Sequence, residues 1–132
     1  MGFHHELAVR YGEVDAQRVV FNAHYLAYVD DAMDHWMRLL DQQFEAMGWD
    51  FMVKRAELVW QGSAGLGDLL EIDSAVIRWG TTSFDVEHRM RVGPRPVATV
   101  VTTYVGIEAG TATVMAPPDE VRRHLGGPPA TG

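Results

Sequence analysis

The sequence predicts a single α+β domain in which one long helix packs on an antiparallel sheet. Two observations indicate this class. One segment of the chain repeats its apolar side chains in steps of three and four, as an amphipathic helix does. The rest consists of alternating or β-branched segments joined by very short turns, and strands linked in this way pair antiparallel.

The predicted helix covers residues 23–47. Its apolar positions are Tyr25, Val29, Ala32, Met33, Trp36, Leu40, Phe44 and Met47. Asn22 is the N-cap candidate because its side-chain oxygen can accept a hydrogen bond from a first-turn amide, and Gly48 is a natural stop. An unbroken helix of this length would span about 37 Å, longer than the sheet needs, so we expect a break near residues 40–43.

Five segments are predicted to be strands: Leu7–Tyr11, Phe51–Trp60, Leu69–Trp79, Ser83–Val92 and Pro96–Ile107. The fourth has the clearest alternation, with mostly apolar residues in one phase and charged residues in the other. The fifth is rich in β-branched valine and threonine. A short C-terminal helix is predicted from residues 117–120, where prolines and acidic residues suit a first turn.

Residues 1–125 are expected to form one domain, and residues 126–132 a flexible C-terminal tail. The length of 132 residues is that of one ordinary domain, and the chain contains no internal repeat or linker. The tail reads GGPPATG, which offers no large side chain to a core. One helix covers only one face of a single sheet, so we expect a homodimer or a dimer of dimers to cover the rest.

The composition excludes several classes of function. The sequence has no cysteine, so it has no thiolate nucleophile, disulfide or cysteine-ligated metal. A net charge of −7 is a poor balance for binding nucleic acid. No apolar run approaches the roughly 20 residues of a membrane span, and the first residues contain no apolar stretch typical of a signal peptide, so we expect a cytoplasmic protein without a membrane partner.

Motifs for the commoner kinds of site are absent. The glycine-rich segment GSAGLGD lacks the Lys-Ser/Thr ending of a phosphate-binding loop, and no serine lies in a GxSxG elbow. The six histidines form no HxxxH or HExxH pattern. We therefore expect neither a metal nor a cofactor.

The segment between the first strand and the long helix carries the candidate chemistry. A helix N-terminus presents unpaired amides with partial positive charge, which are the parts of an oxyanion hole. Asp15 lies seven residues before Asn22, close enough to fold back over that terminus. A carboxylate beside such amides is a minimal site for acyl transfer. Asp15 also fits a purely structural role in capping a turn, and the residues alone favour this simpler interpretation.

The same segment resembles the signature of the 4-hydroxybenzoyl-CoA thioesterase family of hotdog-fold proteins. The matching residues are YGEVDA at positions 11–16 and VVFNAHYL at positions 19–26. Weaker similarities follow in the family's order at residues 64–68, 80–84, 95–99 and 118–121, so the resemblance spans most of residues 4–125. It implies a hotdog fold, in which a bent five-stranded antiparallel sheet wraps a long central helix, with sites at a dimer interface.

The resemblance also implies residue roles. Asp15 matches the family's catalytic carboxylate, the backbone amide near Asn22 matches the donor to the thioester carbonyl, and Tyr25 matches an aromatic residue under the helix start. The implied reaction is thioester hydrolysis, in which Asp15 attacks the carbonyl or activates a water. Arg18 departs from the pattern because the family usually has glycine there.

The implied substrate is an acyl-CoA. Its acyl group is expected to lie against Phe21, Tyr25 and Trp60, for which core packing is the alternative. Because CoA is a polyanion and the protein is acidic, positive charge must gather locally, and Arg91 is a candidate together with Arg78, Arg89 and Arg95. Thr82 and Ser83 are candidate hydrogen-bond partners of the phosphates or the pantetheine arm. Two alternatives remain: a thioesterase acting on acyl or polyketide chains bound to a carrier protein, and a non-catalytic acyl-binding module.

Overall fold

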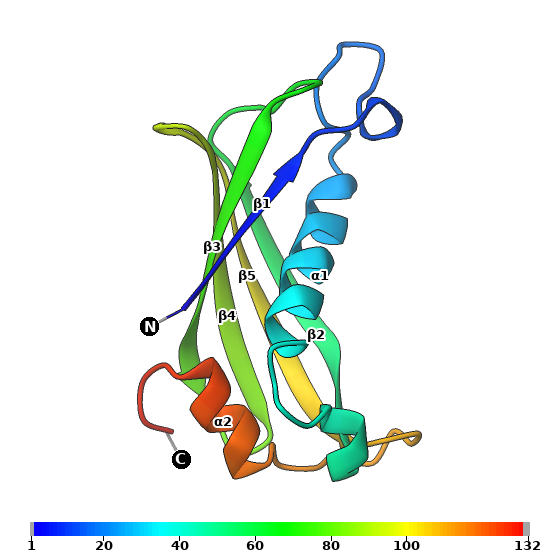
Figure 1. Ribbon diagram of the computed structural model, residues 1–132, viewed down its shortest axis with the longest axis vertical. Coiled ribbons are helices and arrows are strands. Elements are labelled where there is room, and N and C mark those ends of the chain that lie inside the picture. Colours follow the sequence, from blue (N-terminus) through cyan, green and yellow to red (C-terminus); the bar gives the residue numbers. More distant parts are fainter. Residues whose placement is uncertain (1, 131–132) are drawn as a thin grey trace.

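The computed structural model describes residues 2–130, and Figure 1 shows the arrangement of its elements. In chain order these are β1 (Phe3–Ala8), η1 (Tyr11–Glu13), α1 (His24–Met37), η2 (Phe44–Met47), β2 (Trp49–Trp60), β3 (Leu69–Trp79), β4 (Ser83–Val92), β5 (Arg95–Glu108) and α2 (Asp119–Leu125), where η denotes a short 3₁₀ helix. The predicted α+β class is confirmed.

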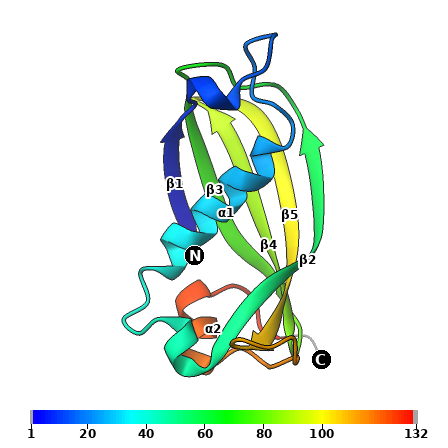
Figure 2. The same cartoon turned by 90° about the vertical axis from the view of Figure 1, so that its right-hand side faces the viewer.

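The five strands form one antiparallel sheet in the order β1-β3-β4-β5-β2. The register shifts between Val53 and Arg55, between Val76 and Arg78, and at Arg91, and such irregularities bend strands. Figures 1 and 2 show the bent sheet curving around α1, which lies across its inner face. The predicted wrapped-helix arrangement is therefore confirmed. No helix among the described residues is both long and apolar enough to cross a membrane.

The first strand lies earlier than predicted. β1 covers Phe3–Ala8, whereas Tyr11 belongs to η1. The strand is placed by its partner, because Phe3 pairs with Ser74 and Ala8 with Leu69 along β3. A pairing partner that is distant in the sequence leaves no local signal for the bounds of the strand.

The predicted 23–47 helix is interrupted as expected, but it ends sooner. α1 has 14 residues and stops at Met37, and η2 forms a separate turn that ends at Gly48 in the left-handed region (φ 78°). The predicted N-cap is wrong: Ala23 occupies that position with helical angles and without a side-chain hydrogen bond. Asn22 is exposed, and its carbonyl accepts from the Tyr25 amide at 3.4 Å.

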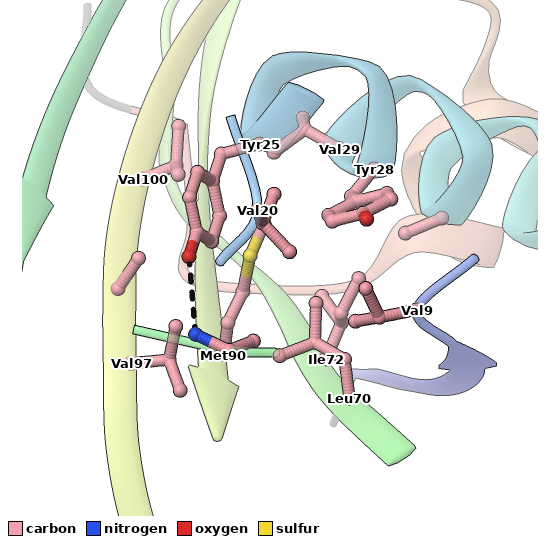
Figure 3. Packing of buried hydrophobic residues seen from close by; sticks show 13 residues of the cluster. Val9, Val20, Tyr25, Tyr28, Val29, Leu70, Ile72, Met90, Val97 and Val100 are labelled. Carbon is pink, nitrogen blue, oxygen red and sulfur yellow. Dashed lines mark hydrogen bonds between the residues drawn. The ribbon is translucent and has the colours of Figure 1, made fainter. Parts of the chain in front are cut away.

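The core lies between α1 and the inner face of the sheet. Near the start of α1, Tyr25, Tyr28 and Val29 pack on Ile72 and Met90, as Figure 3 shows. The other end holds a second, aromatic-rich cluster that α2 closes. Its largest members are Trp36, Trp49, Trp79, Phe84 and Tyr104. The core thus anchors both ends of the sheet independently.

Part of the predicted tail lies against the sheet. The Trp79 Nε1–H donates to the Gly126 carbonyl at 2.7 Å. A side chain at Gly127 would meet the Val76 carbonyl at 2.8 Å, so this glycine packs closely on β3. Folded structure therefore extends to Gly127, and residues 131–132 of the predicted tail lie outside the described residues.

His88 is a buried titratable group that makes stability depend on pH. It is completely buried, its Nδ1 pairs with the Ser74 hydroxyl at 2.7 Å, and burial lowers its pKa from 6.5 to about 4. The unfolded chain therefore binds more protons than the folded chain between these values, so stability falls as pH falls through this window. Relative to His88→Gln, the wild-type free energy of unfolding should drop by roughly 2 kcal/mol between pH 7 and 5. Urea denaturation at both pH values measures this difference, and an identical pH dependence in both proteins would contradict it.

Candidate active site

The segment before α1 folds into a small hairpin that ends at Asp15. The Phe21 amide donates to the Glu13 carbonyl at 2.9 Å, Val14 bridges to Val20, and the Asp15 amide donates to the Val19 carbonyl at 2.9 Å. Residues 16–18 form the turn. The hairpin therefore holds Asp15 at the same end of the molecule as the start of α1, at the top of Figure 1.

Asp15 both stabilises this turn and lines a cleft. Its Oδ1 accepts from the Gln17 amide at 2.8 Å, which is the turn-capping role that the sequence suggests. The carboxylate is only partly buried. It lines a cleft of about 670 Å³ together with Tyr11, Gly12, Val14, Ala16, Arg18 and Leu66. The structural role and access to a ligand are thus compatible.

The start of α1 leaves amide donors free. Among residues 2–130, neither the Asn22 nor the Ala23 amide donates to a protein acceptor, whereas the His24 amide is used by the Phe21 carbonyl at 2.9 Å. Free N–H groups at a helix start are what an oxyanion donor requires. Asn22 does not line the Asp15 cleft, so its catalytic role stays a prediction.

Glu13 ties the hairpin to α1, a role that the sequence analysis missed. Its carboxylate accepts from the Arg10 amide at 2.9 Å, from the Arg10 guanidinium at 2.6 Å and from the Tyr28 hydroxyl at 3.0 Å. Burial opposes ionisation of Glu13, but these hydrogen bonds outweigh it and hold the pKa of the carboxyl below its usual value. Burial and the neighbouring Glu13 raise the pKa of Tyr28. In the sequence, the indication of this role is that an acidic residue lies two positions before Asp15.

Tyr25 anchors the other side of the hairpin. It is only 1% exposed, and its hydroxyl accepts from the Ala64 amide at 3.4 Å (Figure 3). The Ala64 carbonyl accepts in turn from the Val20 amide at 2.9 Å. In the single chain the ring has almost no free surface, so the predicted contact between Tyr25 and an acyl group stays a prediction.

Phe21 and Trp60 remain available to a ligand. They are 52% and 48% exposed, although both are large and apolar. The Trp60 ring contacts Tyr25 edge-on at 6.5 Å, which places the end of β2 beside the start of α1. Their predicted role in binding the acyl group stays a prediction.

Thr82 and Ser83 lie at the opposite end of the sheet from Asp15, because β4 begins there beside α2 (Figure 1). The Ser83 hydroxyl accepts from Arg78 at 3.0 Å, and the Thr82 carbonyl accepts from the Gly106 amide at 2.7 Å. Within one chain they therefore lie away from the Asp15 cleft, and their predicted contacts with the phosphates or the pantetheine arm stay a prediction. Sequence similarity placed both in the site without showing which end of the sheet they occupy.

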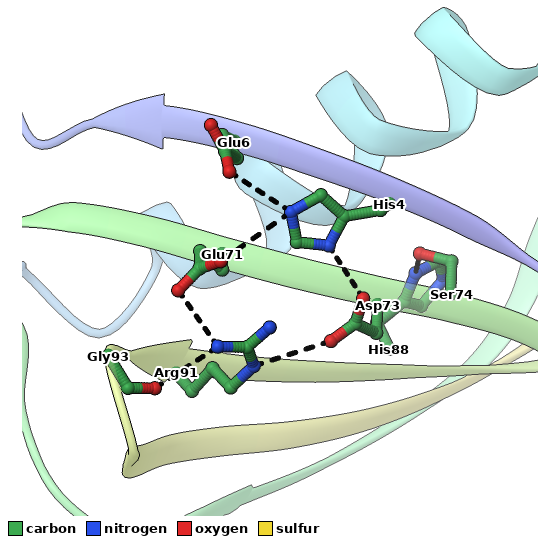
Figure 4. Close-up of polar contacts among 8 residues, drawn as sticks. All are labelled: His4, Glu6, Glu71, Asp73, Ser74, His88, Arg91 and Gly93. Atoms are coloured by element: carbon green, nitrogen blue, oxygen red, sulfur yellow. Dashed lines mark hydrogen bonds and ion pairs between the residues drawn. The ribbon is translucent and has the colours of Figure 1, made fainter.

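The predicted phosphate-binding arginine is already engaged. Arg91 faces away from α1 and donates to Glu71 at 2.8 Å and to Asp73 at 3.4 Å, and Asp73 also bonds to His4 at 2.6 Å (Figure 4). The three other candidates are paired as well. They are Arg78 with Asp85, Arg89 with Glu87, and Arg95 with Asp68. Cross-strand and neighbouring carboxylates therefore neutralise these arginines within the single chain, and their predicted role in phosphate binding stays a prediction.

Arg18 is the unusual residue of the hairpin. Its φ of 63° makes it the one non-glycine residue with positive φ in the described chain. Its amide donates to the Asp15 carbonyl at 2.9 Å, and this bond closes the turn. Glycine adopts this conformation freely, which explains why the resembling family usually has glycine here.

Replacing Arg18 by glycine should stabilise the protein. A non-glycine residue in the left-handed region costs about 1–2 kcal/mol, so Arg18→Gly should raise the free energy of unfolding by about 1 kcal/mol. Arg18→Ala is the matched control because it removes the same side chain but keeps the Cβ that causes the strain. Urea denaturation would contradict this account if both variants changed stability equally.

Two clusters of possible metal ligands lie elsewhere in the described residues. One joins His5 on β1 to Asp31 and His35 on α1, and the other joins His4, Glu6 and Glu71. Within the first, His5 already bonds to the Asp31 carboxylate at 2.7 Å, and His35 bonds to the Asp31 carbonyl at 2.8 Å. Neither cluster belongs to the Asp15 cleft.

Known proteins resemble this chain over most of its length. A 1,4-dihydroxy-2-naphthoyl-CoA hydrolase of Synechococcus elongatus is 28% identical over 108 residues, which cover 78% of this chain and 79% of the relative. The structure of YbaW, a probable thioesterase from Escherichia coli, has a TM-score of 0.82 and 26% identity, covering 92% and 95% of the two chains.

A more distant structure shares the fold. SAV2348 from Staphylococcus aureus, solved in complex with CoA, has a TM-score of 0.85 at 13% identity and covers 95% of this chain and 82% of that one. Residues 9–125 of this chain match the Thioesterase-like superfamily, and this range includes the hairpin, α1 and the entire sheet except β1. The resemblance seen in the sequence is thereby confirmed, and the chain belongs to the Thioesterase-like superfamily.

Proposed function

We propose that this protein hydrolyses an acyl-CoA thioester to a free acid and CoA, with Asp15 as the nucleophile or general base. The observation that carries the proposal is Asp15 in an open cleft, on a hairpin that leads directly to the free amides of α1. Membership of the superfamily supports the reaction class. The Synechococcus relative, whose name describes a CoA-thioester hydrolase, supports CoA as the leaving group.

In the proposed reaction the thioester carbonyl accepts from the amides of Asn22 and Ala23, which stabilise the developing oxyanion. Along one route the Asp15 carboxylate attacks the carbonyl carbon, CoA thiolate leaves, and water then hydrolyses the acyl anhydride. Along the other, Asp15 takes a proton from a water that attacks the carbonyl carbon directly, and the C–S bond then breaks as the CoA thiolate leaves and takes up a proton. Burst kinetics with one enzyme equivalent of released thiol would distinguish the first route.

A homodimer would complete the site. Thr82 and Ser83 lie far from Asp15 within one chain, so they can join the site only from a second copy. β2 is an edge strand with exposed apolar residues, a surface that suits such a partner. These are Met52, Val53, Val59 and Trp60.

The charges of the structure do not suit an acidic carrier protein as the acyl donor. An acidic carrier needs a broad basic patch. Among the described residues, the basic side chains without a hydrogen-bond or ionic partner are Arg18, Lys54 and Arg123, which lie on the hairpin, on β2 and on α2. Scattered charges of this kind do not form such a patch.

The test is a panel of aromatic and aliphatic acyl-CoA thioesters, with free thiol release as the readout. We expect hydrolysis of at least one group well above the background rate. The best acyl group is then compared on CoA and on a carrier protein, and faster hydrolysis from the carrier would support that alternative. Binding without hydrolysis across the panel would support a non-catalytic acyl-binding module instead.

A further inference from the structure

Arg18 carries an unused positive charge beside Asp15. Every other arginine in the described residues, except Arg123 on α2, donates to a carboxylate or a carbonyl. Arg18 is exposed and makes no such contact. In a chain with a net charge of −7, a free guanidinium beside the candidate carboxylate is unusual. It is a group that an anionic ligand can bind.

The backbone holds Arg18 in place at a conformational cost. Arg18 lies three residues after Asp15 in the left-handed conformation, and both residues line the same cleft. Strained residues that persist at a ligand cleft point to a function for that side chain. A glycine would close the same turn without strain, so the guanidinium itself is the feature that distinguishes this loop.

The rest of the cleft is mostly apolar. Tyr11 is 82% exposed and Leu66 is 51% exposed, and Val14 and Ala16 line the cleft beside them. Exposed apolar side chains of this kind suit the carbon skeleton of an acyl group. The cleft therefore offers one candidate nucleophile or base, an apolar surface and one cation.

The position of Arg18 indicates which anion it meets. Arg18 belongs to the same turn as Asp15. Its guanidinium is therefore expected near the thioester carbonyl on which Asp15 would act. The phosphates of CoA are separated from the thioester by the whole pantetheine arm. The anion nearest to Arg18 is therefore one carried by the acyl group, and a carboxylate matches the planar guanidinium with two parallel hydrogen bonds.

Building on the proposed thioesterase function, we propose that Arg18 binds a carboxylate of the acyl group, so that monothioesters of dicarboxylic acids are the preferred substrates. Arg18 is then a specificity-determining residue. Asp15 acts on the thioester carbonyl at one end of the acyl group, and the guanidinium holds the free carboxylate at the other.

The test compares acyl groups that differ in a single charge. Glutaryl-CoA is matched with pentanoyl-CoA, and 4-carboxybenzoyl-CoA with 4-methylbenzoyl-CoA. We expect the wild-type protein to prefer the carboxylated member of at least one pair by about tenfold or more in kcat/KM. Arg18→Ala should lose this preference, because kcat/KM falls further for the carboxylated member of each pair than for the uncharged member. Arg18→Lys should keep part of it, and Arg123→Ala, which removes the other unpaired arginine, should keep all of it.

Three outcomes would overturn the inference. One is a wild-type protein that hydrolyses thioesters without preferring either carboxylated substrate, which leaves the proposed function intact. Another is an equal loss on both members of a pair in Arg18→Ala, which would assign Arg18 to loop shape. The third is an Arg18→Ala effect that disappears with N-acetylcysteamine thioesters, which lack the CoA phosphates and would identify those phosphates as the anion. A wild-type protein that hydrolyses no thioester would overturn the proposed function itself.

Discussion

Replacing Asp15 by asparagine is expected to lower kcat by more than a hundredfold while the protein stays folded. Asparagine keeps an Oδ1 atom that can accept from the Gln17 amide, so the turn persists. It removes the negative charge on which both nucleophilic attack and base catalysis depend, and a positioned general base contributes about 10²–10⁴-fold. Thiol release at saturating substrate measures the effect, and circular dichroism checks the fold.

Two further variants separate chemistry from turn structure. Asp15→Ala removes the charge and the hydrogen bond to Gln17, so it should be as inactive as Asp15→Asn and also less stable. Asp41→Asn changes an exposed carboxylate beyond the end of α1 and should leave kcat unchanged. Full activity in folded Asp15→Asn would remove Asp15 from the mechanism.

Replacing Phe84 by alanine is expected to lower the free energy of unfolding by about 3–5 kcal/mol. Phe84 is completely buried at the centre of the aromatic cluster. Its ring lies 4.9 Å from that of Trp79 and 5.2 Å from that of Tyr104, so alanine would leave a cavity among rigid rings. Such a loss is a large fraction of the roughly 5–15 kcal/mol that stabilises a typical domain.

Urea denaturation with a common m-value measures the loss, and two controls test its cause. Phe84→Leu fills part of the cavity and should lose less than Phe84→Ala. Tyr11→Ala removes an aromatic ring that is 82% exposed and should change stability by no more than about 0.5 kcal/mol. A loss below about 1 kcal/mol in Phe84→Ala would show that the cluster rearranges to close the cavity.

The parts of the fold that were predictable from the sequence have strong local patterns. The strand predicted over Ser83–Val92 is β4 to the residue, because its alternation is a local property of a half-buried strand. Gly48 ends η2 in the left-handed conformation that glycine allows. β1 was misplaced because its bounds come from pairing with β3, which lies more than 60 residues away.

The candidate site divides in the same way. Asp15 could be predicted as a candidate because the whole hairpin motif is contiguous in the sequence, and in the structure it lines a cleft. The ion pairs of Arg91 could not be predicted, because its partners Glu71 and Asp73 lie on the neighbouring strand. The sequence also did not show that Tyr25 is buried, or that Thr82 and Ser83 lie at the opposite end of the sheet from Asp15.

By itself, the sequence determined the fold class and the superfamily, and it singled out Asp15 as the candidate catalytic carboxylate. Local periodicity and a contiguous motif carry this information. Only the tertiary structure decided which charges are free. Ion pairing joins residues that are distant along the chain, and it neutralises the arginines of the later strands while Arg18 stays unpaired. The left-handed conformation of Arg18 is likewise imposed by the closed hairpin, since an arginine alone gives no local preference for it.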